Sequence, residues 1–568
     1  MGTAHRLLRG ESPDTDTTDT RSRLTRPTLF TPSLSLALPL SSLSVSSSQP
    51  LHRHHIITMA VTTSLIMTQN LPVQPATPLS DEVISLSSLD QQAQRHYPKV
   101  LFFFRVDHAS SKLKRDALLH NLRRGLALSL NEAPDFAATV VPVPGTTRKE
   151  LQLQLGPESA VPWKVVDYTT QDTQTDEEGE NANAWKYGSY DHLATNHFSI
   201  TDIPPSLLVD PACLHVPDDA QSAPALTIQV NLLRGGLILA VCWHHTVSDA
   251  RGLNVLINAW ARHTSSSSSS SCASASPAEP EEGARDRWRL NYGPRTATLA
   301  NLPEYKIDAS ARSPLTAGSP HLHDRLDPVG KPFVVSTWSF TADALQTLRG
   351  VVADAAAETA ETGVKQSFTS VEAVSALAWR HLTRARFPSP EEQSAAGTSL
   401  FSTRLDFRAR LQPPLPATFI GNVCEPNALA RLPLSTIITP GPATLATLAS
   451  AIRAGTEAVT DEVVRAHIGV INTLPGAVTD LTWGYDLFPG PDLGVTDLSA
   501  LDTMRTDWGV GMGGMPERLR LATRENGLVY IFPGGGEGGL EVQMQCEVGA
   551  VERLRGDREW GEFAAFVV

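Results

Sequence analysis

The sequence has few cysteines, and none of them forms a motif. Only five occur among 568 residues, and no two have the Cys-x-x-Cys spacing that zinc and redox sites commonly use. An odd number of scattered thiols does not describe a disulfide framework and fits a reducing compartment. We therefore expect a cytoplasmic protein without a metal centre. The five are Cys213, Cys242, Cys272, Cys424 and Cys546.

Positive charge is also scarce. The chain has 47 Lys and Arg residues against 60 Asp and Glu, which gives a formal net charge of -13. Binding a polyanion needs a concentrated basic face, and the sequence has no basic run of that kind. We therefore expect no nucleic-acid partner, and any anionic ligand must be bound by a few local charges.

Long apolar runs are missing as well. A membrane helix needs about 20 consecutive apolar residues, whereas the apolar stretch at residues 29–45 is interrupted by Pro32 and Pro39. We expect no membrane span. This stretch lies within residues 1–77, which are rich in Ser, Thr and Arg and have no sustained period. Three interpretations of this leader stay open: disorder, a targeting segment, or translation from a start codon placed too early.

The composition changes from residue 78 onwards to that of folded domains. Segments with strand and helix periods occur on both sides of a serine-rich stretch of low complexity, which we place at residues 263–330. The fold class predicted is mixed α/β (α+β). We expect an N-terminal lobe over residues 78–262, a crossover linker, and a C-terminal lobe over residues 331–568.

The clearest local pattern lies between residues 225 and 262. Residues 226–232 alternate between apolar and polar, which predicts a half-buried strand. After a Gly-Gly turn, residues 237–243 are continuously apolar, which is typical of a central strand. Residues 253–260 then carry apolar side chains at helical spacing. His245 is therefore expected where a buried strand ends and a helix is about to begin.

His245 and Asp249 are the candidate catalytic residues. An imidazole with a pKa near 6.5 can accept a proton at neutral pH, and a carboxylate four residues later can orient the ring or hold the loop through another partner. A buried histidine pair bonded to the backbone is the structural alternative. A metal bound by His244, His245 and Asp249 would lack a further strong ligand, so we predict none.

Three motifs in order resemble the BAHD acyltransferases, within them the fungal branch that includes trichothecene 3-O-acetyltransferase. His245 and Asp249 match the family's His-x-x-x-Asp, and residues 406–411 with Gly421-Asn422 match the segment leading into its Gly-Asn turn. Residues 507–511, Asp-Trp-Gly-Val-Gly, echo the family's Asp-Phe-Gly-Trp-Gly. The resemblance covers residues 78–568.

The resemblance implies both a fold and a reaction. The fold would be two similar chloramphenicol-acetyltransferase-like domains with a channel between them. The protein would be a cytoplasmic monomer. It would transfer a short acyl group, with acetyl as the first candidate, from acyl-CoA to a hydroxyl or an amine of a small specialised metabolite. Acyl-CoA is then a cosubstrate, no cofactor is tightly bound, and His245 is the general base of a ternary complex.

The resemblance also assigns supporting residues. Arg408 would form an ion pair with Asp249 and fix the loop. Asp507, Gly509 and Gly511 would form either a tight turn that supports the site or part of the CoA channel, and we favour the turn. Thr496 would make a polar contact with the acyl group or the oxyanion of the cosubstrate.

Two other functions stay open. A condensation domain of non-ribosomal peptide synthesis has the same fold and a similar His-His-x-x-x-Asp core, but takes its acyl group from a carrier protein. A catalytically silent binding protein could also keep the fold. Ala250 stands where the family usually has glycine, and Leu498 where tryptophan is common. These departures leave room for the second alternative.

Overall fold

The computed structural model describes most of the chain after residue 66. The described residues are 67–107, 111–169, 189–200, 205–210, 213, 221–266, 281–308, 333–359, 366–487, 490–522, 528–534 and 538–568. The leader up to residue 66 lies outside them. Residues 67–70, which were expected from the sequence to lie in the leader, form the edge strand β1 and pair with β6.

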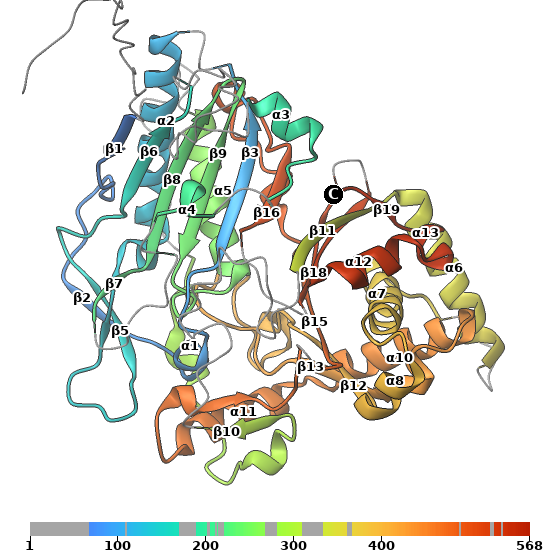
Figure 1. Ribbon diagram of the computed structural model, residues 1–568. Helices are drawn as coiled ribbons and strands as arrows, with labels where there is room; N and C mark the ends of the chain where they lie inside the picture. The colour runs from blue at the N-terminus through green and yellow to red at the C-terminus, as the bar shows by residue number, and fades with distance from the viewer. Residues whose placement is uncertain are drawn as a thin grey trace, which may run out of the picture. The chain divides into compact units, whose positions relative to one another are not determined.

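Two large mixed sheets organise the described residues (Figure 1). The first has the strand order β1 (Met67–Asn70), β6 (Trp163–Asp167), β8 (Leu226–Leu233), β9 (Gly236–Trp243), β3 (Lys99–Arg105) and β16 (Arg518–Leu521). The second has the order β13 (Ala428–Pro433), β12 (Thr398–Thr403), β15 (Leu493–Asp497), β17 (Leu528–Pro533), β18 (Leu540–Glu547), β11 (Phe333–Phe340) and β19 (Ala565–Phe566). This confirms the mixed α/β class.

Two smaller sheets extend this core. One consists of β2 (Glu82–Ser85), β5 (Leu151–Leu155), β4 (Thr139–Pro142) and β7 (Ala223–Pro224), and the other of β10 (Tyr305–Ile307) and β14 (Leu481–Trp483). β16 comes from the predicted C-terminal lobe but pairs with β3 in the first sheet. The division into lobes at residues 78–262 and 331–568 stays a prediction.

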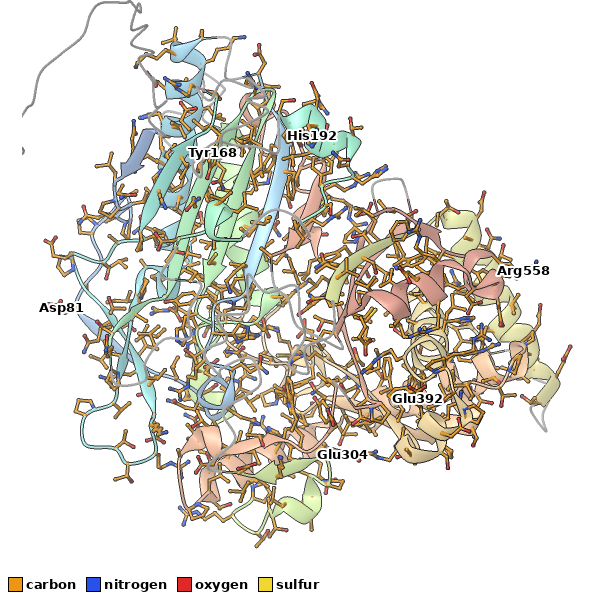
Figure 2. All side chains as sticks on the ribbon, viewed as in Figure 1. Asp81, Tyr168, His192, Glu304, Glu392 and Arg558 are labelled. Atoms are coloured by element: carbon orange, nitrogen blue, oxygen red, sulfur yellow. The ribbon has the colours of Figure 1, made fainter. Side chains whose placement is uncertain are left out.

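Helices cover the sheets. The helices are α1 (Ser88–Gln92), α2 (Lys112–Glu132), α3 (Tyr190–Thr195), α4 (Pro205–Leu208), α5 (Ala250–Ser266), α6 (Ala342–Thr359), α7 (Ser370–Arg386), α8 (Pro390–Ala396), α9 (Leu434–Ile437), α10 (Pro442–Ala458), α11 (Asp461–Thr473), α12 (Val548–Arg555) and α13 (Arg558–Gly561). Figure 2 shows Tyr168 and His192 beside the first sheet, and Glu392 and Arg558 among the helices of the second. Among the described helices, none combines the length and the apolar character that crossing a bilayer requires.

One hydrophobic core joins the two sheets. It contains apolar residues of β3, β8 and β9 together with Leu122 of α2 and Trp260 of α5, and it also takes in Leu528, Tyr530 and Phe532 from β17. The alternate residues of β17 face a second core under α6, α7 and α10. The period of two in β17 therefore turns one face of the second sheet towards the first sheet.

The strand, strand and helix predicted around His245 are confirmed, with one correction. β8, β9 and α5 lie where expected, but β8 is buried on both faces rather than half-buried. Its polar residues are buried because they bond inward: Gln229 donates to Asn231 at 2.7 Å, and Asn231 donates to the Leu208 carbonyl at 3.0 Å. A period of two cannot distinguish exposed polar groups from satisfied buried ones.

Part of the expected linker is folded. Within residues 281–308 the chain forms two short 3-10 helices and β10. Arg287 in the first of these helices is only 2% exposed, and Leu290 is fully buried. Composition alone marked this segment as a linker, whereas its few large side chains anchor it to the core.

Candidate active site

His245 lies just beyond the end of β9. Its backbone N–H donates to the His96 carbonyl at 3.0 Å, which ties it to the segment before β3. The rings of His96 and His245 meet edge to face, with centroids 5.4 Å apart. His245 keeps part of its surface exposed, whereas His244 is 1% exposed. The imidazole of His245 can therefore meet a ligand.

The His245 ring is held by Asn422. The ring Nδ1 lies 3.1 Å from the Asn422 side-chain oxygen. The Asn422 amide nitrogen donates instead to the His245 carbonyl and to Asp90, both at 2.9 Å. Since this amide orientation leaves only an acceptor facing the ring, Nδ1 carries the proton and donates to Asn422. Nε2 is then left with a lone pair that can accept a proton.

The electrostatic surroundings keep this ring neutral. Burial lowers the pKa of His245, the positive charge of Arg404 acts in the same direction, and the hydrogen bonds and Asp249 oppose them only in part. The pKa of His245 therefore lies below its usual 6.5. At neutral pH the ring is unprotonated at Nε2, which is the form that a general base requires.

His244 fits the structural interpretation instead. Its Nδ1 lies 2.7 Å from the Thr246 hydroxyl, and its ring packs edge to face against Tyr97. Burial lowers the pKa of His244 to about 3. The two adjacent histidines thus differ: the first is a neutral residue of the core, and the second faces the candidate site.

Asp249 forms the ion pair predicted with Arg408. Its two oxygens accept from the Arg408 guanidinium at 2.9 and 3.0 Å, and from the backbone N–H groups of Gly252 and Val423, both at 2.9 Å. Both groups are buried, with side chains 7% and 3% exposed. Asp249 therefore joins the start of α5 to the turn that carries Asn422, and its carboxylate is fully used there.

A buried ionic network that sequence reasoning missed supports Asn422. Asp90 accepts from the Asn422 backbone N–H at 2.7 Å and from Arg287 at 2.7 Å. Arg287 also donates to Asp135 at 2.7 Å and to the Val247 carbonyl at 2.8 Å. The signal available in the sequence was the capping box of Ser87 and Asp90 at α1, but nothing local connects it to His245.

The Asp-Trp-Gly-Val-Gly motif has the geometry of a tight turn. Gly509 has a φ of 83°, and a Cβ there would approach Ser265 to 2.8 Å, so only glycine fits. Asp507 accepts from the Gly509 N–H at 2.8 Å. Gly511 lies in the 3-10 turn that follows, and Trp508 is fully buried in the first core. The structural interpretation of Asp507 and Gly511 stays a prediction.

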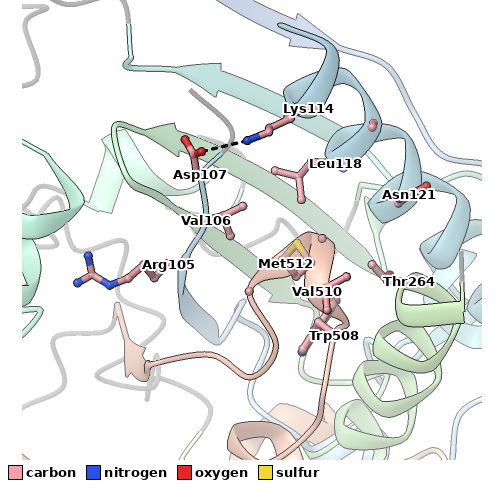
Figure 3. Close-up of a pocket in the computed structure, with 13 residues that line it drawn as sticks. Arg105, Val106, Asp107, Lys114, Leu118, Asn121, Thr264, Trp508, Val510 and Met512 are labelled. Carbon is pink, nitrogen blue, oxygen red and sulfur yellow. Dashed lines mark hydrogen bonds and ion pairs between the residues drawn. The ribbon is translucent and has the colours of Figure 1, made fainter. Parts of the chain in front are cut away.

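A pocket of about 400 Å³ lies beside this turn. Figure 3 shows Trp508, Val510 and Met512 on one side of it, and Lys114 and Leu118 of α2 on another. It lies at the Arg105 end of β3, whereas His245 lies at the Lys99 end. Six residues of extended strand span about 20 Å, so this pocket and His245 are separate. Thr496, on β15 beside Tyr530 of β17, keeps part of its surface exposed.

The described fold and comparisons with known proteins define an acyltransferase. A model of the Transferase family matches residues 207–555, and a model of the trichothecene 3-O-acetyltransferase-like N-terminal domain matches residues 96–263. This chain belongs to the Transferase family. It is 48% identical to the acyltransferase easC of Emericella nidulans over 87% of this chain and 97% of that one. It is 42% identical to the acyltransferase cm3D of Cordyceps militaris over 86% and 97%.

A solved structure supports the fold. TRI101 of F. graminearum, solved with coenzyme A and T-2 mycotoxin, superposes with a TM-score of 0.67 at 16% identity. The match covers 86% of this chain and all of that one. The expected similarity to the BAHD fold is thereby confirmed.

Proposed function

We propose that this acyltransferase moves a short acyl group, acetyl in the first instance, from an acyl-CoA to a hydroxyl of a small specialised metabolite. The observation that carries the proposal is the hydrogen bond between His245 Nδ1 and Asn422, which leaves Nε2 as a proton acceptor. A thioester donor is supported by the TRI101 structure, which contains coenzyme A. The protein would act as a cytoplasmic monomer.

His245 would act twice in the reaction. Its Nε2 takes the proton of the acceptor hydroxyl as the oxygen attacks the thioester carbonyl, which forms a tetrahedral oxyanion. When the carbon–sulfur bond breaks, the imidazolium returns the proton to the CoA thiolate. The acceptor ester and free CoA leave, and His245 is neutral again. This direct transfer in a ternary complex requires no acyl-enzyme.

Two further roles belong to this proposal. Thr496, partly exposed on β15, would donate to the oxyanion, and one such donor typically lowers the barrier by about 3–4 kcal/mol. Asp249 and Arg408 would fix the loop after His245 without touching the reactants, because the Asp249 oxygens are already occupied by Arg408 and two backbone N–H groups. A channel between the lobes would bring donor and acceptor to the ring from opposite sides.

The reaction can be tested by free thiol release. Purified full-length protein is incubated with acetyl-CoA and longer acyl-CoAs and with a panel of alcohols and amines, while a thiol reagent reports free CoA. We expect thiol release that depends on both the acyl-CoA and an alcohol. Turnover with carrier-protein-bound acyl groups alone would favour the condensation-type alternative, and no transfer from any donor would contradict the proposal.

A further inference from the structure

Arg404 follows directly after β12. β12 runs parallel to β15, and the last pair of this ladder joins Thr403 to Val495. The next residues along the two strands are Arg404 and Thr496. Thr496 in turn pairs with Tyr530, which belongs to the core shared with the first sheet. Arg404 therefore leaves the second sheet next to the strand that carries Thr496.

An aromatic stack holds the guanidinium of Arg404. It lies over the ring of Trp483 at 4.8 Å from the ring centroid. Trp483 stacks on Tyr485, with centroids 5.3 Å apart and planes inclined by 12°. The Tyr485 hydroxyl accepts from the Asn427 amide at 2.7 Å. A guanidinium held over an aromatic face in this way is positioned by the ring and does not use its N–H donors for the contact.

These N–H groups lack a protein acceptor among the described residues. No hydrogen bond from the Arg404 side chain and no carboxylate within 4.0 Å is found there. The buried residues Arg408 and Arg287 differ, since Arg408 is paired with Asp249 and Arg287 with Asp90 and Asp135. The guanidinium of Arg404 is only partly buried, so its N–H groups are free to donate to a ligand that supplies an acceptor.

The position of Arg404 connects it to the reacting atoms. Its charge acts on the rings of both His245 and His96 and lowers the pKa of each. The carboxylate of Glu425 raises the pKa of Arg404 against the opposing effect of burial, but it lies beyond ion-pair distance and accepts from the Tyr305 hydroxyl. Arg404 also lies four residues before Arg408, whose guanidinium binds Asp249 at 2.9 Å. We therefore expect a group bound to Arg404 to lie within reach of His245.

We propose that Arg404 binds a carboxylate carried by one of the two reactants, so that this enzyme prefers an acidic acceptor or a dicarboxylic acyl donor. The proposal rests on the proposed function, because it assigns the charge of a substrate to the same site. The planar fork of a guanidinium matches the two oxygens of a carboxylate. The anionic end would be held at the end of β12, and the reacting end would point to His245.

Matched substrate pairs test this proposal and identify the reactant. In the acceptor arm, hydroxy acids are compared with their methyl esters, with acetyl-CoA as donor. In the donor arm, succinyl-CoA is compared with butyryl-CoA, with a neutral alcohol as acceptor. The quantity measured is the ratio of kcat/KM, charged over neutral, within each protein variant. This ratio cancels any general loss of activity in a variant.

The wild-type enzyme is expected to prefer the charged member of one arm by about 10- to 100-fold. Arg404→Gln should abolish this preference, and Arg404→Lys should keep only part of it because lysine lacks the fork. Arg558→Gln, an exposed arginine on α13, is the control and should keep the full ratio (Figure 2). A wild-type ratio near one in both arms, or an unchanged ratio in Arg404→Gln, overturns the proposal.

A binding measurement separates this proposal from the proposed function. The same hydroxy acids and succinyl-CoA are titrated calorimetrically into the wild-type protein and into Arg404→Gln, which needs no turnover. If Arg404→Gln binds the carboxylates more weakly but no substrate pair releases thiol, the anion site is supported and the proposed acyl transfer is contradicted. Equal binding by both proteins would reject the anion site even if acyl transfer occurs.

Discussion

Replacement of His245 by alanine is expected to lower kcat for acyl transfer by about 100- to 10,000-fold, the usual contribution of a general base. The acceptor hydroxyl would then lose its proton only to water. The measurement is the initial rate of thiol release at saturating acyl-CoA and acceptor. Because His245 is partly exposed and its ring is held by Asn422, we expect the variant to fold.

The control for this variant is another histidine. His120 is exposed on α2, and His120→Ala should keep the wild-type rate. Circular dichroism and the urea midpoint of both variants show whether they are folded. A folded His245→Ala protein with undiminished kcat would remove His245 from the mechanism.

The replacement Asp249→Ala is expected to destabilise the protein by about 3–5 kcal/mol, because it leaves the buried Arg408 without its main partner. It also removes the acceptor for the N–H groups of Gly252 and Val423. The turn that carries Asn422 would loosen, and with it the orientation of the His245 ring. We therefore expect a loss of free energy of unfolding together with a lower kcat in the remaining folded protein.

An exposed ion pair provides the comparison. Asp116 pairs with Lys112 one turn away on α2, with side chains 49% and 78% exposed, and Asp116→Ala should cost less than about 1 kcal/mol. Urea unfolding gives both free energies on one scale. If Asp249→Ala is as stable as Asp116→Ala and fully active, the Asp249–Arg408 pair has no supporting role.

The local elements around His245 could be predicted because their signals are local. Three local patterns each determine one element, and together they place His245 at a junction. They are the alternation of residues 226–232, the apolar run of 237–243 and the helical spacing of 253–260. Asp249 and Arg408 were paired through the resemblance, since 159 residues separate them in the chain. No periodicity could have joined them.

The support behind the ring was not predictable in this way. The supporting residues come from three distant elements and meet only after folding. Asp90 lies in α1, Arg287 in a 3-10 helix, and Asn422 in the loop before β13. These residue types are common in proteins. Arg287 also lies in a segment whose composition predicted a linker, so the composition did not indicate a supporting residue. The prediction that β8 is half-buried was wrong for the same reason, because the burial of its polar residues depends on partners distant in sequence.

A structure of the protein with bound CoA tests the central claim most directly. We expect the CoA sulfur to lie roughly 3–3.5 Å from His245 Nε2, the approach that reacting groups require, with Nδ1 still bonded to Asn422. CoA bound with its sulfur out of reach of His245, for instance in the pocket beside Val510 about 20 Å away, would contradict the account.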